Sequence, residues 1–342
     1  MVTLRSLARS LVYHVPGECE CCPACGSPRL YDLNLRVLRN VIAGRKTGFV
    51  SGCETCGLVF ANPQPSAAEL AQLYSPEGKW GLRRGEAEPV AQVPAMPRGR
   101  AWARMFDPIR GTLSVRSPHP GAAVMDFGCG TGKLLDSLQE SGWSTFGIEP
   151  AMDHAFRRHQ RLEVVPDVPT FDLIVAEHVL EHTPDPLRLL RQFAAASRRD
   201  GFMFISVPRL DTLPEHRDYK YVLQGHVHIT AYTWPFLQAL LARAGWSPVA
   251  PPPDMTPKGR GRRTRSKLRV LARRVEGPIA SPPRPAQAAR AAFREYYAQH
   301  DDRPVLERMG LFRLAAVSAE ARRRRARRAG KIKAAAERVS LP

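Results

Sequence analysis

The chain has 342 residues, a length that suits about two domains. Because 44% of the residues are hydrophobic and 8% are aromatic, the chain as a whole is globular and not intrinsically disordered. Its net charge of +19 is carried mainly by the last part of the sequence, because residues 251–342 hold 24 of the 51 lysines and arginines but 8 of the 32 acidic residues. The sequence has no window of about 18 apolar residues and no recognisable export signal, so we expect no transmembrane segment and a cytoplasmic protein.

Changes in composition predict four consecutive segments. A cysteine-rich, zinc-ribbon-like module spans residues 1–65 and ends in a turn-rich Asn-Pro-Gln-Pro run. A helical lead-in covers residues 66–118, the main domain covers residues 119–250, and a basic tail rich in Pro, Arg and Ala covers residues 251–342. We expect the tail to be partly helical or disordered.

Six of the seven cysteines lie between residues 19 and 56, which in a reducing compartment favours metal binding over disulfides. Two C-x-x-C-G motifs provide four thiolates, enough to close a tetrahedral, structural Zn²⁺ site. Between the motifs, residues 29–38 and 47–52 are expected to form the two strands of a hairpin. Cys19 also forms C-x-x-C with Cys22, so the ligand register stays open, as does the alternative of a redox pair. The preferred ligands are Cys22, Cys25, Cys53 and Cys56.

In the main domain, short apolar runs alternate with helical patterns. This alternation predicts an α/β fold with a Rossmann-like, doubly wound, mostly parallel sheet and helices on both of its faces. Such a sheet binds its ligand at the carboxyl ends of the strands. The expected strands are residues 122–127, 144–149, 171–177 and 201–208, and the expected helices lie within residues 133–142, 150–161, 178–198 and 232–246.

A glycine-rich loop follows the first of these strands. Gly128, Gly130 and Gly132 allow the backbone to turn tightly beside a ligand, and the amides at the start of the next helix open toward that ligand. Glu149 ends the following strand, twenty-one residues after Gly128, where its carboxylate would accept hydrogen bonds from both hydroxyls of a ribose. The alternative is that the glycines serve only a tight turn.

The details of the loop distinguish two classes of nucleotide ligand. A dinucleotide-binding loop needs G-x-G-x-x-G, whereas the spacing here is G-x-G-x-G and Lys133 stands where the third glycine would fall. Asp126 precedes the loop, and its carboxylate would repel a pyrophosphate but would suit an amino group and a sulfonium. The loop therefore indicates a nucleoside with a cationic amino-acid arm.

The segments MDFGCGTGKLL, FGIEP and FDLIVAEHVLEHTPDPLRLL, in this order and spacing, resemble those of class I S-adenosylmethionine-dependent methyltransferases. The last segment is similar to that of small-molecule members, and the resemblance covers about residues 119–250. The stretch CPACG…CETCGLVFANPQP also resembles a zinc-binding segment that precedes some bacterial methyltransferases. The resemblance implies S-adenosylmethionine as the cofactor and a methyltransferase domain at residues 119–250.

By this resemblance the three glycines border the methionine arm and Asp126 holds its amino group. Glu149 binds the ribose, while Pro150, Ala151 and Met152 lie near the adenine. The chain between Glu149 and the strand at residues 171–177 is shorter than the family usually has. Asp167 is therefore the candidate for the acidic residue that meets the adenine amine.

Methyl transfer to a hydroxyl or to an acidic carbon also needs a general base. Candidate side chains follow the third and fourth strands, in loops that should face the cofactor. Two of these side chains have structural alternatives, since His182 could cap a helix and Glu181 could pair with an arginine. The candidate bases are His178, His182, His226 and His228, with Glu177, Glu181, Tyr219 and Tyr221 as further possibilities.

Three functions remain open. The first is methylation of a small-molecule acceptor, such as a sugar or another biosynthetic intermediate, on oxygen or carbon. The second is an RNA or protein methyltransferase that docks its substrate with the basic tail and the zinc ribbon, although no NPPY-type motif follows the third strand. The third is a non-catalytic binding module. The tail favours an anionic partner, either nucleic acid or anionic lipid, unless it is only a solvated segment.

Overall fold

The computed structural model describes residues 19–41, 44–75, 119–151, 156, 158–215, 222, 228–249, 267–277, 279 and 286–292. The chain divides into two compact units, Met1–Phe293 and Arg294–Pro342, and all of the described residues belong to the first. The basic tail beyond residue 292 therefore lies outside the described residues. Within the described part of the chain, no helix combines the length and the apolar character needed to cross a membrane.

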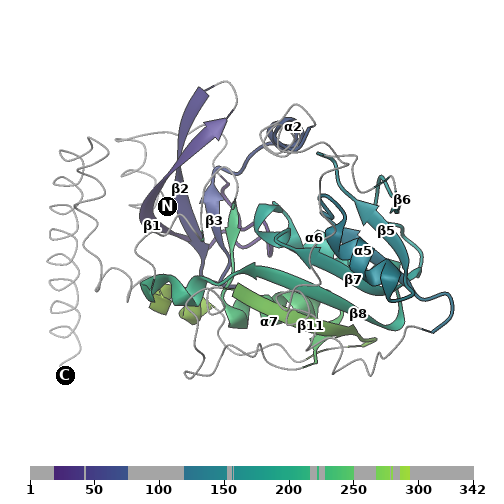
Figure 1. The fold of residues 1–342 in the computed structure, drawn as a ribbon. Coiled ribbons are helices and arrows are strands. Elements are labelled where there is room, and N and C mark those ends of the chain that lie inside the picture. Colours follow the sequence, from purple (N-terminus) through teal and green to yellow (C-terminus); the bar gives the residue numbers. More distant parts are fainter. Residues whose placement is uncertain are drawn as a thin grey trace, which may run out of the picture. The chain divides into compact units, whose positions relative to one another are not determined.

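A seven-stranded sheet in the order β10-β11-β8-β7-β4-β5-β6 forms the centre of the main domain (Figure 1). All neighbouring strands pair in parallel except β11, which runs antiparallel to both β10 and β8. The predicted doubly wound, mostly parallel sheet is confirmed. Its strands are β4 (Ala123–Phe127), β5 (Ser144–Ile148), β6 (Gln160–Arg161), β7 (Phe171–Glu177), β8 (Ser197–Pro208), β10 (Trp246–Pro248) and β11 (Lys267–Arg274).

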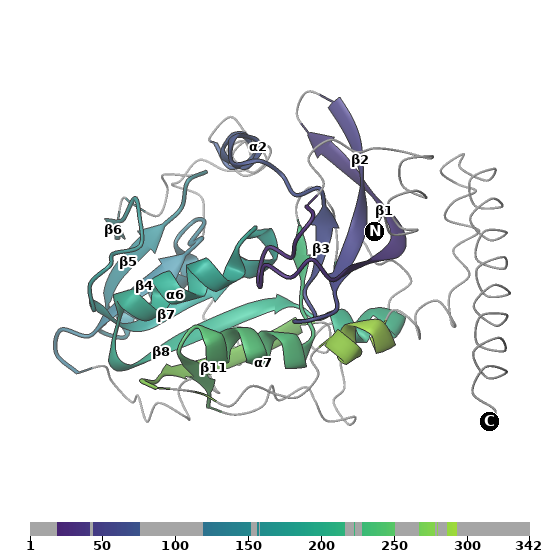
Figure 2. The same ribbon diagram turned by 180° about the vertical axis from the view of Figure 1, so that it is seen from behind.

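Helices cover both faces of this sheet because alternate side chains of each central strand are buried on opposite sides. Helix α5 (Lys133–Glu140) packs with Val124 and Val175 on one face. Helices α6 (Pro186–Ala196) and α7 (Trp234–Arg243) pack on the other face, against the side of the sheet that Met125 presents, and they lie in front of the sheet in Figure 2.

Strand β11 lies beyond the boundary expected at residue 250, in a segment that the sequence analysis assigned to the basic tail. Its side chains alternate, with Leu268, Val270 and Ala272 at most 1% exposed and Lys267, Arg269, Leu271 and Arg273 more exposed. The strand pairs with the C-terminal part of β8, from Lys267↔Pro208 to Arg273↔Phe202. The main domain therefore takes a structural strand from the arginine-rich region.

A smaller antiparallel sheet has the order β1-β2-β3-β9. The expected hairpin is formed by β1 (Leu30–Val41) and β2 (Gly44–Cys53), and β3 (Val59–Asn62) continues the sheet. Its fourth strand is β9 (Thr230–Ala231), which comes from the main domain and pairs Val59↔Ala231 and Phe60↔Thr230. The cysteine-containing module and the main domain thus share one sheet.

Helix α2 (Ala67–Leu73) begins the expected helical lead-in. Ser66 and Glu69 form a reciprocal capping box at its start, in which each side chain binds the backbone N–H of the other residue. Residues 76–118 of the lead-in lie outside the described residues.

A second difference from the sequence prediction, besides β11, concerns β6. The end of the helix expected over residues 150–161 is instead the short strand β6, which pairs with β5 at the edge of the sheet.

Candidate cofactor and active site

A cavity of about 810 Å³ opens at the carboxyl ends of β4, β5 and β7. This is the position at which a doubly wound sheet binds its ligand. The cavity reaches from the glycine loop to the loop after β7, and helix α2 contributes to its wall. The lining residues include Leu70, Tyr74, Gly128, Glu149, Pro150, Ala151, Glu163, Glu177, His178 and His182.

The loop after β4 needs its glycines for conformational reasons. Gly128, Gly130 and Gly132 have φ values of 78°, 56° and 77°, in the left-handed region that other residues seldom adopt. A Cβ atom at Gly128 would also lie 3.0 Å from Cγ2 of Val179. The loop can therefore bring its backbone close to a ligand, and α5 starts directly after Gly132.

Glu149 is held at the cavity by backbone amides. The N–H of Gly130 donates to its Oε2 and the N–H of Ala151 donates to its Oε1, both at 2.9 Å. These bonds fix the carboxylate beside the glycine loop, as a ribose-binding residue would require. Pro150 lines the same wall, whereas Met152 lies outside the described residues.

Asp126 is almost completely buried, with 4% of its surface exposed, at the end of β4. Burial, together with the negative charges of Glu177 and Glu149, raises the pKa of the Asp126 carboxyl to about 8. A cationic group in the cavity would offset this cost by pairing with the carboxylate. Asp126 itself is not among the residues that line the cavity, although its neighbours Phe127 and Gly128 are, so its contact with the amino group of an amino-acid arm stays a prediction.

The structure does not bring Asp167 to the cavity. This residue is exposed and does not line the cavity, whereas Glu163, which comes two residues after β6, does. The Glu163 carboxylate lies 2.7 Å from Nε of Arg161. Glu163 is also exposed, but because it lines the cavity it is an alternative candidate for the adenine contact.

Tyr74 is a site residue that the sequence analysis did not identify. It follows α2, lines the cavity, and places its ring 6.2 Å from that of His182 in an edge-on contact. Its hydroxyl is buried and has no hydrogen-bond partner within the described part of the chain. Burial and the charges of Glu181 and Glu149 raise the pKa of the hydroxyl, so it stays a neutral donor facing this region. The helical pattern predicted α2, but no local signal places α2 over the cavity.

His178 begins the loop after β7 with a φ of 56°, an unfavourable value for a residue other than glycine. Its backbone N–H donates to the carbonyl oxygen of Ser206 at 2.8 Å. Its Nδ1 lies 2.7 Å from Oε1 of Glu181, and its Nε2 lies 2.6 Å from Nζ of Lys267. Both ring nitrogens are therefore engaged, one by a carboxylate and one by an amine.

Glu181, His182 and His228 form a second group, in which one ligand atom from each lies within 4.8 Å of the others. Glu181 is fully buried, and the His182 and His228 rings meet edge-on at 5.0 Å. Burial opposes the ionisation of Glu181, but the bond to His178 and the nearby histidines outweigh it and lower the pKa of the carboxyl. The group could exchange a proton or share a divalent ion. His226, Tyr219 and Tyr221 lie outside the described residues.

The four preferred cysteines converge at the base of the β1–β2 hairpin. Sulfur–sulfur distances are 3.6 Å for Cys22–Cys56 and for Cys25–Cys53. Disulfide sulfurs lie about 2.05 Å apart, whereas sulfurs on a tetrahedral zinc with bonds of about 2.3 Å lie about 3.8 Å apart. The spacing therefore fits a four-thiolate metal site, and the amides of residues 55 and 56 also point to Sγ of Cys53.

The two spare cysteines do not join this cluster. Cys19 uses its backbone to bond the side chain of Asn62, and Cys21 is exposed.

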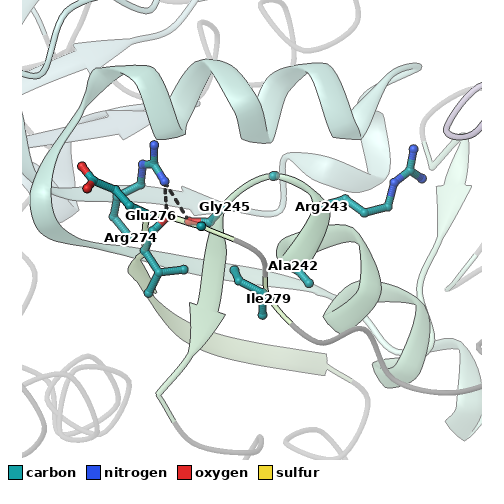
Figure 3. A pocket seen from close by; sticks show the side chains of 9 residues that line it. Ala242, Arg243, Gly245, Arg274, Glu276 and Ile279 are labelled. Atoms are coloured by element: carbon teal, nitrogen blue, oxygen red, sulfur yellow. Dashed lines mark hydrogen bonds between the residues drawn. The ribbon is translucent and has the colours of Figure 1, made fainter.

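A second cavity of about 580 Å³ lies where α7 ends near β11 (Figure 3). Its most prominent charged group, Arg274, donates to the carbonyl oxygens of Gly245 and Val275 (dashed lines in Figure 3) and to that of Ala194. The hydrogen bonds of this guanidinium therefore stabilise the main chain, and the group is not a candidate for ligand binding. The first cavity remains the candidate site.

Comparisons with known proteins agree with this geometry. Residues 100–250 match a family described as a methyltransferase domain. The ubiquinone biosynthesis O-methyltransferase of Aliivibrio fischeri strain ES114 is 25% identical over 157 residues, which cover 41% of this chain and 62% of the relative. That of Xanthomonas campestris pv. campestris strain B100 is 30% identical over 167 residues, which cover 42% of this chain and 64% of the relative.

Among solved structures, the 1,6-didemethyltoxoflavin-N1-methyltransferase of Burkholderia thailandensis covers 67% of this chain with 96% of its own length, at 18% identity and a TM-score of 0.43. The chain spans less than two thirds of the length of the curated relatives named above. The sheet and the glycine loop define a Rossmann-like nucleotide-binding domain. More specifically, residues 100–250 match a methyltransferase domain, and their sheet and glycine loop are those expected of the class I, S-adenosylmethionine-dependent type.

Proposed function

We propose that the protein transfers a methyl group from S-adenosylmethionine to oxygen or carbon of a small-molecule acceptor. The observation that carries this proposal is one continuous cavity, in which a glycine loop with Glu149 adjoins a loop that presents His178 and His182. One end has the groups that bind a nucleoside with an amino-acid arm, and the other end has the groups that accept a proton.

The cofactor supplies a methyl group on a sulfonium, which is already a good leaving group, so the protein mainly has to orient the reactants. Asp126 holds the amino group of the cofactor, the glycine loop borders its methionine arm, and Glu149 binds its ribose. Glu163 takes the place first expected for Asp167 near the adenine.

His182 is the general base that we favour. Its ring lines the cavity, and Glu181 lies close enough to stabilise the imidazolium that forms when the base takes a proton. His228 supports the ring from the side. His178 is a weaker candidate because Lys267 already occupies its Nε2. His226 stays an untested alternative.

The four-cysteine cluster is proposed to hold a structural Zn²⁺. Four thiolates leave no open coordination position, so the ion would stabilise the hairpin and take no part in methyl transfer. The pKa of Cys53 is lowered by hydrogen bonds from Cys22 and Cys56, so one thiolate is already favoured in this cluster.

The test combines calorimetry with methyl transfer. The purified chain should bind S-adenosylhomocysteine, and methyl-labelled cofactor should label a low-molecular-weight fraction of a cell extract. Glu149→Gln should weaken binding, whereas Glu140→Gln, an exposed change of the same kind at the end of α5, should not. Label in RNA or protein would instead support a macromolecular substrate, and absence of both binding and label would overturn the enzyme proposal.

A further inference from the structure

Two basic side chains of β11 lie beside the ends of β7 and β8. Lys267 and Arg269 are two residues apart on one strand, so they project from the same face of the sheet. Arg269 pairs with Ser206 of β8, and Ser206 pairs in turn with Glu177 of β7. Glu177 lines the cavity. The row formed by Glu177, Ser206 and Arg269 therefore extends from the cavity toward β11.

Two polar atoms in this row have no hydrogen-bond partner among the described residues. They are the buried hydroxyl of Ser206 and the buried Nε of Arg269. Ser206 is fully buried, with 0% of its surface exposed. A buried donor without a partner costs about 1–3 kcal/mol, so such atoms in one row indicate a ligand that completes them.

The charges of these side chains also favour an anionic ligand. Among the described residues, no carboxylate lies within ion-pair distance of Arg269, whereas its strand neighbour Arg273 pairs with Asp200 at 2.9 Å. Burial is the main cause that lowers the pKa of Lys267; Glu177 and Glu181 oppose it, and the charge of Arg269 adds to it. An oxyanion that contacts both Lys267 and Arg269 would give Arg269 the counter-charge that it lacks among the described residues.

We propose that Lys267, Arg269 and Ser206 form a binding site for an oxyanion of the acceptor, a phosphate or a carboxylate. The inference rests on the proposed methyltransferase function. It places the charged group of the acceptor on the β11 side of His178, whose Nε2 contacts Nζ of Lys267 at 2.6 Å. The acceptor would then extend from this site past His178 toward His182 and the methyl donor.

The test uses the full chain, with inorganic phosphate and acetate as separate probes followed by NMR titration. Lys267→Gln and Arg269→Gln should each weaken binding of the preferred anion by about tenfold or more, because each removes a charge-assisted hydrogen bond. Arg273→Gln changes the same charge on the same strand and should leave anion binding unchanged. Preference for phosphate or for acetate identifies the chemistry of the acceptor group.

Ser206→Ala gives an independent readout. Since it removes an orphaned hydroxyl, it should raise the melting temperature without anion and reduce the further rise that the anion produces. Equal anion binding by wild type and the Lys267 and Arg269 variants, or an equal loss in Arg273→Gln, would overturn the anion site. Calorimetry with S-adenosylhomocysteine on the same samples separates this outcome from failure of the proposed function, because cofactor binding does not depend on these three side chains.

Discussion

Asp126 combines a buried carboxyl with a position beside the glycine loop. Its pKa of about 8 lies above the value of 3.8 for the unfolded chain. The folded chain without ligand therefore binds this proton more tightly than the unfolded chain does. As a result, Asp126 disfavours folding increasingly as the pH rises from about 4 to about 8. Asp126 thus lowers the stability of the ligand-free protein, as expected of a carboxylate whose function is to bind a cation.

Asp126→Asn should therefore raise the melting temperature of the ligand-free protein at pH 8 and weaken S-adenosylmethionine binding. In the wild type, affinity should increase as the pH rises toward 8, because the carboxylate must ionise to pair with the amino group. Calorimetry at several pH values and thermal melts check both effects. Asp167→Asn, at an exposed position away from the cavity, should change neither, and a pH-independent affinity in the wild type would contradict the role of Asp126.

His182→Asn should lower kcat by about 10²–10⁴-fold, the usual contribution of a general base, while leaving S-adenosylhomocysteine affinity unchanged. The rise of kcat with pH should also disappear in this variant, because the titrating base is gone. His178→Asn serves as the comparison. If it abolishes the pH dependence and His182→Asn does not, the base is His178.

At the scale of elements, β11 shows that a high arginine content can hide the hydrophobic pattern of a strand in the sequence. Its buried residues alternate with more exposed ones, most of which are basic, and the high charge of residues 251–342 hid this period-2 pattern. A chain that ends at residue 250 should expose the edge of β8 and fail to give a cooperative melt. A chain that ends at residue 292 should melt like the full chain, as checked by circular dichroism. Cooperative melting of the shorter chain would show that β11 is dispensable.

The sequence was sufficient to predict the parallel core, the glycine loop and the cysteine hairpin, because each depends on local patterns. MDFGCG needs left-handed glycines, and two C-x-x-C-G motifs can share one ion wherever a hairpin brings them together. The positions of Tyr74 and Lys267 were not predictable in this way. Each reaches the site through the placement of an element distant in sequence, and neither belongs to a local motif. Strand β6 was not predicted because a two-residue strand leaves almost no hydrophobic pattern.

For the whole molecule, the four-cysteine cluster, proposed to hold Zn²⁺, and the candidate cofactor cavity are connected through β3 and α2. Removal of the metal with a chelator, or Cys25→Ser, should lower the melting temperature and also weaken S-adenosylhomocysteine binding, because α2 positions Leu70 and Tyr74. Thermal melts and calorimetry measure the two effects. Cys21→Ser, at an exposed cysteine outside the cluster, is the matched control and should behave like the wild type.

The basic tail can be tested with the same chain ending at residue 292. If the tail binds an anionic partner, the full chain should bind RNA or anionic vesicles more tightly than the shortened chain, and added salt should reduce the difference. Cofactor binding should be equal in the two chains. Equal binding of RNA and of vesicles by both chains would refute a role of the tail in docking.

The pairing of β9 with β3 has a consequence for protein engineering. A recombinant chimera that joins this cysteine module to another methyltransferase at residue 65 would leave the outer edge of β3 without its natural partner. The cysteine module therefore cannot be transferred to another protein by itself without losing the pairing of β3 with β9. A functional graft would have to bring along the stretch around Thr230 and Ala231, and natural recombination within such genes would face the same constraint.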